Sequence, residues 1–472
     1  MTGSVPKQLE FRVEDSATRS ALDALCSSVR AAGGSASLVG GCVRDAVLGL
    51  PATDLDIEIY GIEAAALVEL LSSNFGVDLV GESFGVIRLR DLSIDVSLPR
   101  RESKRGRGHR GFKIDSDPQM DPREAASRRD FTINAISLDP ESGSIFDPFG
   151  GIADLKNRIL RHTTEKFSED PLRVLRGMQF AARFELQIAP ETIELCRQIE
   201  PEGLAPERIL GEWKKLILRG ARPSLGLAFL RDCGWIRHFP ELEALIGCEQ
   251  NPRWHPEGDV WIHTLHCMDV FASERIGVER EDLIVGFAVL CHDLGKPATT
   301  TREEDGRITA KNHDVIGVDL TRQFLGRLTG EEKLIEEVVP LVACHLAPIQ
   351  LFGSNVSDAA IRRLAHRVGR IDRLVRVSGA DLRGRPPLVV DRFEAGDWLL
   401  ERARKLSVDA QPPTPLLMGR HLIELGLEPG PHFGRVLEEC LARQIEGEFD
   451  NLEAGLECAR TIIAEAAKAP TQ

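Results

Sequence analysis

The spacing of apolar residues changes about a third of the way along the chain. Before residue 160, short segments such as Leu55–Tyr60 and Ile94–Leu98 alternate apolar and polar residues. A period of two predicts strands with one polar face. We expect Ser37–Gly41 to be a strand that ends in a glycine pair, and Val43–Leu48 to be the helix that follows it. The first third of the chain therefore predicts a mixed α/β domain.

From about Pro171 the apolar residues follow helical spacing as far as the C-terminus. One stripe of this kind comprises Leu172, Val174, Leu175, Met178, Phe180, Ala181 and Phe184. Such a stripe lies along one side of a helix. Segments rich in Pro or Gly at 201–206, 251–258 and 411–415 are candidate junctions. Everything after about residue 165 is therefore expected to be helical.

Length and composition favour a cytoplasmic protein with two or three folded units. The chain has 472 residues, whereas single cores rarely grow past about 250–300 residues. It has no apolar run near the roughly 20 residues that cross a bilayer, so we expect no membrane partner. The first fifteen residues lack the pattern of a secretory leader. Ten cysteines without a Cys-x-x-Cys pair are typical of reduced thiols.

Charge is distributed unevenly along the chain. The net charge of −14 argues against general binding of polyanions. Residues 100–113, however, read RRESKRGRGHRGFK and carry eight basic side chains, counting His109, against the single acid Glu102. This run is either an ordinary solvated loop or a contact for nucleic acid, and the sequence leaves both interpretations open.

Asp54 and Asp56 are candidate metal ligands. Residues two apart on a strand project from the same face, and two adjacent carboxylates repel each other unless a cation lies between them. Two Mg²⁺ ions held there could activate a hydroxyl and stabilise a leaving pyrophosphate. Asp95 could add a third carboxylate. Asp-x-Asp also occurs by chance on exposed strands, so the pair needs its context.

A glycine pair lies upstream of these aspartates. Gly40 and Gly41 stand where a strand turns into a helix, so backbone N–H groups could approach a triphosphate. Arg44 adds a fork-shaped donor for phosphate oxygens. A tight turn in which Arg44 pairs with Asp45 or Asp54 is the alternative interpretation.

Five motifs occur in a fixed order over about 140 residues. They are Gly40–Asp45 (GCVRD after Gly40), Asp54–Asp56 (DLD), Arg128–Ile136 (RRDFTINAI), Phe146–Gly151 (FDPFGG) and Glu169–Arg176 (EDPLRVLR). The series resembles the class II tRNA nucleotidyltransferases, which are the CCA-adding enzymes, and their relatives the bacterial poly(A) polymerases. The resemblance implies a polymerase-β-like head, with tRNA, CTP and ATP as partners.

The resemblance also implies a role for each matching residue. Asp54 and Asp56 would hold Mg²⁺ and carry catalysis, and Gly41 and Arg44 would meet the triphosphate. The remaining nucleotide-binding residues would be Arg129 and Asp130 at the sugar and phosphates, Asp170 and Arg173 as a template for the base, and Arg176 beside them.

The proposed template has a physical basis. Asp170 and Arg173 are three apart at the start of a helix and share one face. Cytosine and adenine present an amine beside a ring acceptor, which matches a carboxylate beside an arginine, whereas uracil and guanine do not. Asp170 before Pro171 is also a standard helix cap. Gln179 stands where relatives usually carry another arginine, so the order of nucleotide addition stays open.

A second constellation lies in the middle of the chain. His263, His292, Asp293 and Asp381 follow the order His, His-Asp, Asp, and these ligand types suit a divalent metal. Their surroundings resemble the HD domain fused to one branch of CCA-adding enzymes, which is similar to metal-dependent phosphatases and 2′,3′-cyclic phosphodiesterases. The metal could be Ni, Co, Mn or Mg. His313 and His345 could bind a second metal or phosphate, or be ordinary polar side chains.

The fold class that follows is an α+β nucleotidyltransferase head followed by all-α regions. The expected domains are a head at 1–160, a neck with the base template at 161–250, an HD domain at 251–400 and a helical tail at 401–472. The expected activities are addition of C, C and A to the 3′ end of tRNA and, in the HD domain, 2′,3′-cyclic phosphodiesterase or phosphatase activity. The alternatives are a poly(A) polymerase or A-adding enzyme, and an HD phosphohydrolase whose first half only binds RNA. The sequence does not predict an oligomeric state.

Overall fold

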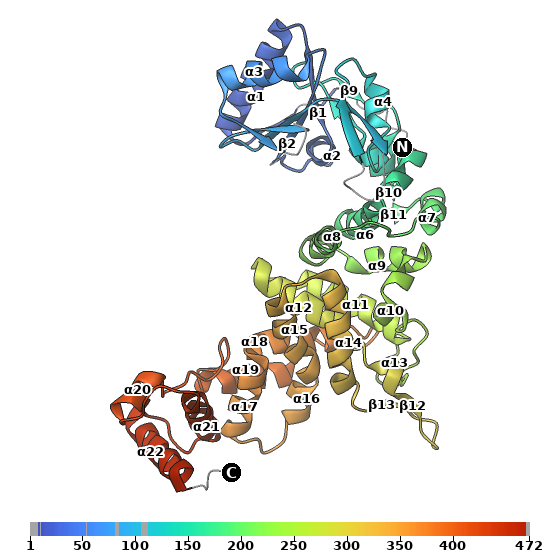
Figure 1. The fold of residues 1–472 in the computed structure, drawn as a ribbon. Coiled ribbons are helices and arrows are strands. Elements are labelled where there is room, and N and C mark those ends of the chain that lie inside the picture. The colour runs from blue at the N-terminus through green and yellow to red at the C-terminus, as the bar shows by residue number, and fades with distance from the viewer. Residues whose placement is uncertain (1–7, 10, 53, 81–84, 105–111, 469–472) are drawn as a thin grey trace. The chain divides into compact units, whose positions relative to one another are not determined.

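The chain folds into two compact units, Met1–Ile236 and Arg237–Gln472. The structure is a computed structural model that describes residues 8–9, 11–52, 54–80, 85–104 and 112–468. Strands gather in the first unit, whereas the second is built mainly of helices (Figure 1). This division confirms the expected fold class.

The first unit contains a seven-stranded mixed sheet with the order β3-β4-β5-β2-β1-β8-β9. β2 and β5 run parallel, and the other neighbours are antiparallel. The strands are β1 (Ser35–Val39), β2 (Leu55–Tyr60), β3 (Val77–Val80), β4 (Val86–Leu89), β5 (Ile94–Ser97), β8 (Ser137–Leu138) and β9 (Ile145–Phe146). The parallel pair β2 and β5 lies inside the sheet.

Alternation of side chains explains why β2 forms where it was predicted. Leu55, Ile57 and Ile59 are buried, so the residues between them lie on the opposite face of the sheet. The apolar side is covered by α1 (Ser16–Ala31), which packs on β1, and by α3 (Ala64–Asn74), which packs on α1 (Figure 1). The polar side chains of β2, on the other face of the sheet, can therefore bind ligands.

Helices complete the first unit. The buried side of α6 consists largely of the predicted stripe, and α6 packs on α8 and α9. The helices are α2 (Gly41–Val47), α4 (Pro122–Ala126), α5 (Gly151–Lys156), α6 (Leu172–Phe184), α7 (Pro190–Arg197), α8 (Pro206–Arg219) and α9 (Pro223–Asp232), with 3₁₀ turns η2 (Thr132–Asn134) and η3 (Glu165–Glu169). The short strands β10 (Ile159–Leu160) and β11 (Gln187–Ile188) pair in parallel.

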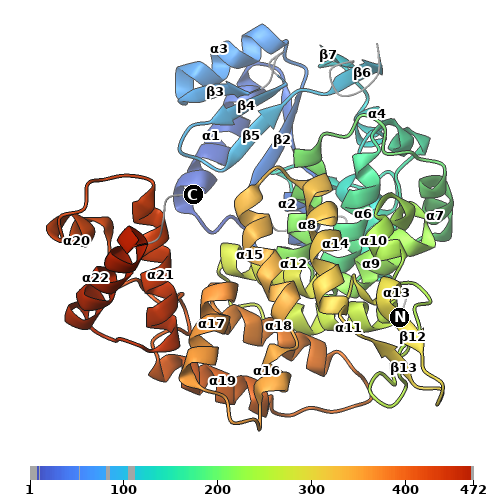
Figure 2. The same cartoon turned by 60° about the horizontal axis from the view of Figure 1, so that its bottom comes forward.

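The second unit is organised around one central helix, α12 (Glu279–Cys291). Every residue from Asp282 to Cys291 is buried, as expected for a helix that is apolar on all sides. It packs on α11, α15 and α18, which lie around it in Figure 2. The helices of this region are α10 (Pro240–Glu243), α11 (Val260–Ser273), α13 (Lys296–Thr299), α14 (His313–Leu328), α15 (Glu332–Cys344), α16 (Ala347–Leu351), α17 (Asp358–Val368), α18 (Ile371–Arg383) and α19 (Glu394–Lys405).

The last helices have a small core of their own. Leu417, Leu422, Val436, Phe449 and Ile462 are buried together. These helices are α20 (Gly419–Glu424), α21 (His432–Glu446) and α22 (Leu452–Lys468). The tail is therefore helical, as expected.

Two antiparallel hairpins depart from the sequence expectations. Inside the helical half, β12 (Thr300–Arg302) pairs with β13 (Ile308–Ala310), because β-branched residues flank a turn in which Gly306 adopts φ +80°. The ends of the basic run, for which a solvated loop was one of the two interpretations, form β6 (Arg100–Lys104) and β7 (Phe112–Ser116). Residues 105–111 of that run lie outside the described residues.

Two further findings concern the chain as a whole. All ten cysteines lie in described segments and are free thiols. In the described ranges, no helix combines the length and apolar character needed to cross a membrane.

Candidate active sites

Carboxylates converge at the centre of the head's sheet. Asp56 lies on the polar side of β2, its Cα partner on β5 is Asp95, and Asp54 directly precedes β2. Asp95 accepts a bidentate pair of hydrogen bonds from Arg88, at 2.9 and 3.0 Å. Burial raises the pKa of Asp56, and the charges of Asp95 and Asp54 add to this against the opposing effect of Arg129. The site is therefore short of positive charge, which a divalent cation would supply.

Gly40 allows the backbone to pass close to these groups. It adopts φ +75° between β1 and α2, a conformation that favours glycine. A Cβ added there would lie 3.2 Å from Arg129 Nη1 and 3.5 Å from Asp56 Oδ2. Gly41 was predicted to meet the triphosphate, but the conformational requirement for glycine falls on Gly40.

Arg44 is held in a buried position by several partners. It pairs with Asp45 at 2.7 Å, as one interpretation of the sequence proposed, and Nη1 donates to Asn134 Oδ1 at 2.7 Å. Its guanidinium also lies over the rings of Phe180 and Phe184, with 5.3 and 4.5 Å to the centroids. Arg44 therefore pairs with Asp45 and also lines the pocket described below.

Asp130 is the centre of a buried network. Its carboxylate accepts hydrogen bonds from Arg176 Nε at 2.7 Å, from Asn134 Nδ2 at 2.9 Å and from the Phe131 N–H at 2.8 Å. Burial opposes the charged form, but Arg176 and these hydrogen bonds outweigh it and lower the pKa of Asp130. Asp130 and Arg176 thus fix each other at the junction of head and α6.

Asp170 and Arg173 lie side by side at the start of α6. Asp170 accepts the Leu172 N–H at 3.1 Å, which is the capping contact, and accepts Arg208 Nη2 at 2.9 Å. Arg173 donates to the backbone oxygens of Lys166 and Arg128, both at 2.7 Å. Both side chains are therefore held in place by the protein, and Arg208 on α8 belongs to the same group.

One pocket of about 460 Å³ is lined by Asp56, Arg44, Asp130, Asp170 and Arg173, whereas Asp54 and Asp95 are not part of its lining. It connects the carboxylate of Asp56 to the pair Asp170 and Arg173. Gln179 is buried elsewhere in α6 and does not line it. Its lining comprises Gly40, Gly41, Arg44, Asp56, Arg128, Arg129, Asp130, Asn134, Asp170, Leu172, Arg173, Arg176, Phe180 and Arg208.

Six residues that line this pocket were not among the predicted site residues. Gly40, Arg128, Asn134 and Leu172 lay inside quoted motifs, and Phe180 lay inside the apolar stripe, so a signal for each was present. Arg208 had none, because it is 38 residues from Asp170 and reaches it only through the packing of α8 on α6.

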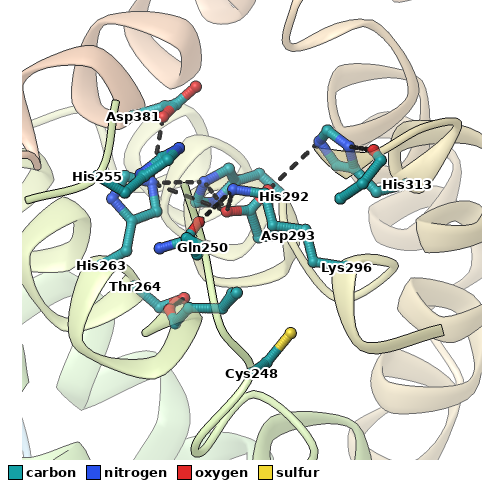
Figure 3. A network of polar contacts seen from close by, with 12 residues as sticks. Cys248, Gln250, His255, His263, Thr264, His292, Asp293, Lys296, His313 and Asp381 are labelled. Atoms are coloured by element: carbon teal, nitrogen blue, oxygen red, sulfur yellow. Dashed lines mark hydrogen bonds and ion pairs between the residues drawn. The ribbon is translucent and has the colours of Figure 1, made fainter. Parts of the chain in front are cut away.

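The second site lies at the ends of α11, α12 and α18. His263 Nε2 lies 3.1 Å from Asp381 Oδ1, 3.4 Å from His292 Nε2 and 3.8 Å from Asp293 Oδ2 (Figure 3). All four residues predicted from the sequence are buried. His263, His292 and Asp381 belong to one group of possible ligands, and Asp293 Oδ2 lies 3.3 Å from His292 Nε2. Cys267 joins them as a further possible ligand.

A second ligand group shares Asp293. Its Oδ1 lies 3.4 Å from His313 Nε2, which in turn lies 3.2 Å from His345 Nε2. Burial, and then the proximity of His292, lower the pKa of His345 to about 4. His345 is therefore a neutral imidazole, the form that binds metals.

Backbone carbonyls orient three of the histidines. Nδ1 of His292, His313 and His345 each lies 2.7 Å from a carbonyl oxygen three residues earlier in the chain. An oxygen acceptor requires the hydrogen on Nδ1, so Nε2 keeps its lone pair. The Nε2 lone pairs of His313 and His345, which face each other at 3.2 Å, repel unless a proton or cation lies between them. The donor set therefore fits a divalent metal.

Charged neighbours complete the second site. Lys296 Nζ lies 2.7 Å from Asp293 Oδ2 and 2.6 Å from Gln250 Oε1, and Arg385 pairs with Asp381. Burial opposes ionisation of both aspartates, but their histidine and cationic neighbours lower the pKa of each. Lys296 and Arg385 lie close in sequence to His292 and Asp381, in the surroundings that resemble the HD domain, but the sequence assigned them no role.

Glu257 holds His263 from the other side. Its Oε1 lies 2.7 Å from His263 Nδ1 and 2.9 Å from His255 Nδ1. Burial opposes the charged form, but these hydrogen bonds lower the pKa of Glu257 to about 2. The carboxylate therefore fixes the ring of a candidate ligand.

Two family models match the chain. Residues 36–161 match the poly A polymerase head domain, and residues 260–377 match the HD domain. Together with the two sites, these matches define a nucleotidyltransferase head joined in one chain to an HD domain.

Relatives specify the family. The multifunctional CCA protein of Xanthomonas campestris pv. campestris is 39% identical over 415 residues, which cover 85% of this chain and 95% of that protein. The multifunctional CCA protein of Tolumonas auensis is 44% identical over 299 residues, which cover 62% of this chain and 69% of that protein. The chain belongs to the multifunctional CCA protein family, the CCA-adding enzymes that carry an HD domain.

Solved structures agree with the fold. The CCA-adding enzyme of Bacillus stearothermophilus in complex with CTP gives a TM-score of 0.63 at 22% identity and covers 96% of this chain and 100% of that one. The Thermotoga maritima enzyme complexed with tRNA gives 0.55 at 21% identity, with coverage of 95% and 96%. At these identities the likeness concerns the fold.

Proposed function

We propose that the first unit performs the reaction for which its family is named, the addition of C, C and A to the 3′ end of tRNA from CTP and ATP. The pocket that joins Asp56 to Asp170 and Arg173 carries this proposal. A nucleotide matches this arrangement, because its phosphates need positive charge at one end of the pocket and its base needs hydrogen-bonding partners at the other.

The residues have separate tasks in this reaction. Asp54 and Asp56 would hold Mg²⁺, which when bound helps to deprotonate the primer 3′ hydroxyl and to neutralise the leaving pyrophosphate. Arg44 and Arg129 bring positive charge to the phosphates. The Asp130–Arg176 pair fixes α6 against the head and so keeps the template at a constant distance from the carboxylates.

The template retains free capacity on its pairing edge. Each oxygen of Asp170 uses one acceptor position on the protein, and Arg173 uses two of its N–H groups on carbonyls. The remaining acceptor and donor positions complement the amine and ring nitrogen of cytosine or adenine. Uracil and guanine would place like groups against each other.

Substitution of Asp56 tests the transferase proposal. Asp56→Ala should abolish incorporation of CTP and ATP into tRNA, with the unfolding temperature close to that of the parent protein, because the side chain lies on the polar face of β2. Asp23→Ala, an exposed position on α1, is the matched control and should keep full activity. Incorporation by Asp56→Ala would contradict the proposed site.

For the second unit we propose a metal-dependent 2′,3′-cyclic phosphodiesterase and phosphatase. His263, His292, Asp293 and Asp381 would hold one divalent ion, and Asp293 would share a second with His313 and His345. Ni, Co, Mn or Mg would, when bound, polarise the phosphate and supply hydroxide at neutral pH. Lys296 and Arg385 contribute positive charge beside the ester.

Substitution of His292 tests the hydrolase proposal. His292→Ala should remove hydrolysis of a 2′,3′-cyclic nucleotide and spare nucleotide addition, because its ring is confined to the second unit. His366→Ala, exposed on α17, is the control histidine and should retain both activities. If His292→Ala keeps hydrolysis, the assigned ligand set is wrong.

The rival functions are less well supported. Relatives with an HD domain favour CCA addition over a poly(A) polymerase. The intact pocket with Asp56, Arg129, Asp170 and Arg173 disfavours a first half that only binds RNA. With tRNA as the substrate, a cytoplasmic location follows from the same proposal.

A further inference from the structure

One tryptophan stands apart from the others in this chain. Trp254 is 57% exposed, although exposure of so large an apolar ring is unfavourable unless a ligand or partner covers it. The other four tryptophans lie in described segments and are buried or half-buried: Trp213, Trp235, Trp261 and Trp398. The exposure of Trp254 therefore needs an explanation.

Trp254 lines the cavity of the HD site. That cavity has a volume of about 330 Å³, and its polar floor includes Asp293, His345 and Asp381. The next residue, His255, packs its ring against that of His263, with centroids 4.7 Å apart. The tryptophan is therefore one residue away from a ring that contacts the proposed metal ligands.

Local contacts hold Trp254 in place. The N–H groups of Trp254 and His255 both donate to the Asn251 carbonyl oxygen, at 3.0 and 2.9 Å. The Arg253 guanidinium lies over one face of the indole, 5.1 Å from its centroid. Because Arg253 covers one face of the indole and the ring is still 57% exposed, a flat ligand could stack on the remaining exposed surface. Since the ring is already held in place, such binding would cost little side-chain entropy.

Apolar residues from other elements continue the wall. Ile349 of α16 is 42% exposed and lines the same cavity, as do Leu346 and Ile308. A phosphate ion could contact the polar residues of the floor but would gain nothing from contact with these apolar side chains. The volume falls in the range of about 300–1,000 Å³ typical of sites for small organic ligands.

We propose that Trp254, backed by Ile349, is the binding wall for the nucleobase of the ester hydrolysed at this site. The ligand class is a nucleoside with a 2′,3′-cyclic phosphate or a 2′-phosphate, with its phosphate on the floor and its base on the indole. The inference rests on the proposed hydrolase activity and adds the feature that distinguishes nucleotide esters from other phosphate esters. Stacking accepts every base, so the wall selects a nucleotide without selecting its identity.

A pair of substrates tests the proposal in the full-length protein. Adenosine 2′,3′-cyclic phosphate and glycerol 1,2-cyclic phosphate share the five-membered phosphate ring, but only the first has a base. The parent protein should prefer the nucleotide in kcat/KM. Trp254→Ala should reduce this preference about tenfold or more, mainly through KM, because a base stacked on an aromatic ring contributes that much to binding.

Two further variants make the kinetic result specific. Trp254→Phe should restore most of the preference, since phenylalanine keeps an aromatic face. Ile423→Ala, which removes an equally exposed apolar residue on α20, should leave it unchanged. Equal hydrolysis of both esters by the parent protein, or an unaltered preference in Trp254→Ala, would overturn the inference.

A measurement of ligand binding tests the Trp254 binding wall independently of the proposed hydrolase activity. Calorimetric titration with the 2′-phosphonate analogue of adenosine 2′-phosphate, which cannot be hydrolysed, in the presence of Mn²⁺ and with CTP added to fill the transferase pocket, should give about tenfold weaker binding for Trp254→Ala. If neither ester is hydrolysed but this difference in binding is found, the hydrolase proposal fails and the wall stands. Equal binding by both proteins would refute the wall itself.

Discussion

Arg208→Ala is expected to weaken the choice of nucleotide without removing catalysis. Arg208 Nη2 donates to Asp170 Oδ2 at 2.9 Å across the packed helices α6 and α8. Without it, the Asp170 carboxylate keeps, among the described residues, only the hydrogen bond from the Leu172 N–H, at 3.1 Å. The carboxylate would then be free to rotate away from the pairing edge of the base.

The size of the effect follows from the exposure of the pair. Their side chains are 31% and 25% exposed, so the value of about 1.5–3 kcal/mol for a charged hydrogen bond is reduced to about 1–1.5 kcal/mol by solvent screening. Since 1.4 kcal/mol corresponds to a factor of about ten, the preference for CTP over UTP should fall about tenfold. A stability loss of that size lowers the unfolding temperature by only about 2–4 °C in a unit of this size.

The assay is single-nucleotide addition to tRNA, with kcat/KM measured separately for CTP, ATP, UTP and GTP. Arg231→Ala removes an arginine from an exposed pair with Asp232 on α9 and is the control. An unchanged ratio of CTP to UTP in Arg208→Ala, together with a lost ratio in Arg173→Ala, would refute a positioning role for Arg208.

Three other predictions concern both sites. Gly40→Ala should reduce incorporation at least tenfold while sparing HD hydrolysis, because φ +75° is strained for alanine, with a cost of about 1–3 kcal/mol; normal incorporation kinetics would contradict this. His345→Ala should reduce tightly bound metal from two ions per chain to one, measured by elemental analysis after desalting, and an unchanged content would exclude the second ion. Chelation should lower the unfolding temperature of the parent protein but much less that of His345→Ala, because the facing Nε2 atoms of His313 and His345 need a cation only in the parent protein; equal shifts would indicate that the metal binds elsewhere.

Local patterns predicted the parts of the fold that depend on local packing. The alternation in Leu55–Tyr60 gave the bounds of β2, because a half-buried strand alternates by necessity. The helical stripe that begins at Leu172 likewise matched the buried side of α6. The β12–β13 hairpin was missed because a three-residue strand is too short for its period to differ from that of a helix.

In the candidate sites, too, some features were predictable from local sequence patterns and others depend on the tertiary structure. His263, His292, Asp293 and Asp381, the ligands predicted from their order in the sequence, lie close together in one buried cluster, and their role as ligands stays a prediction. The Nδ1 contacts that orient three histidines involve backbone oxygens, which no pattern of side chains reveals. Arg208 meets Asp170 through helix packing, and this contact depends on tertiary structure.

The most direct test of the central claim uses tRNA that ends at the discriminator base. The purified protein is incubated with this tRNA, Mg²⁺, and CTP, ATP or both, and the 3′ ends are sequenced. Two cytidines followed by one adenosine, with no addition of U or G, are predicted. A run of adenosines, or adenosine only on tRNA that already ends in CC, would contradict the assignment of CCA addition to this chain.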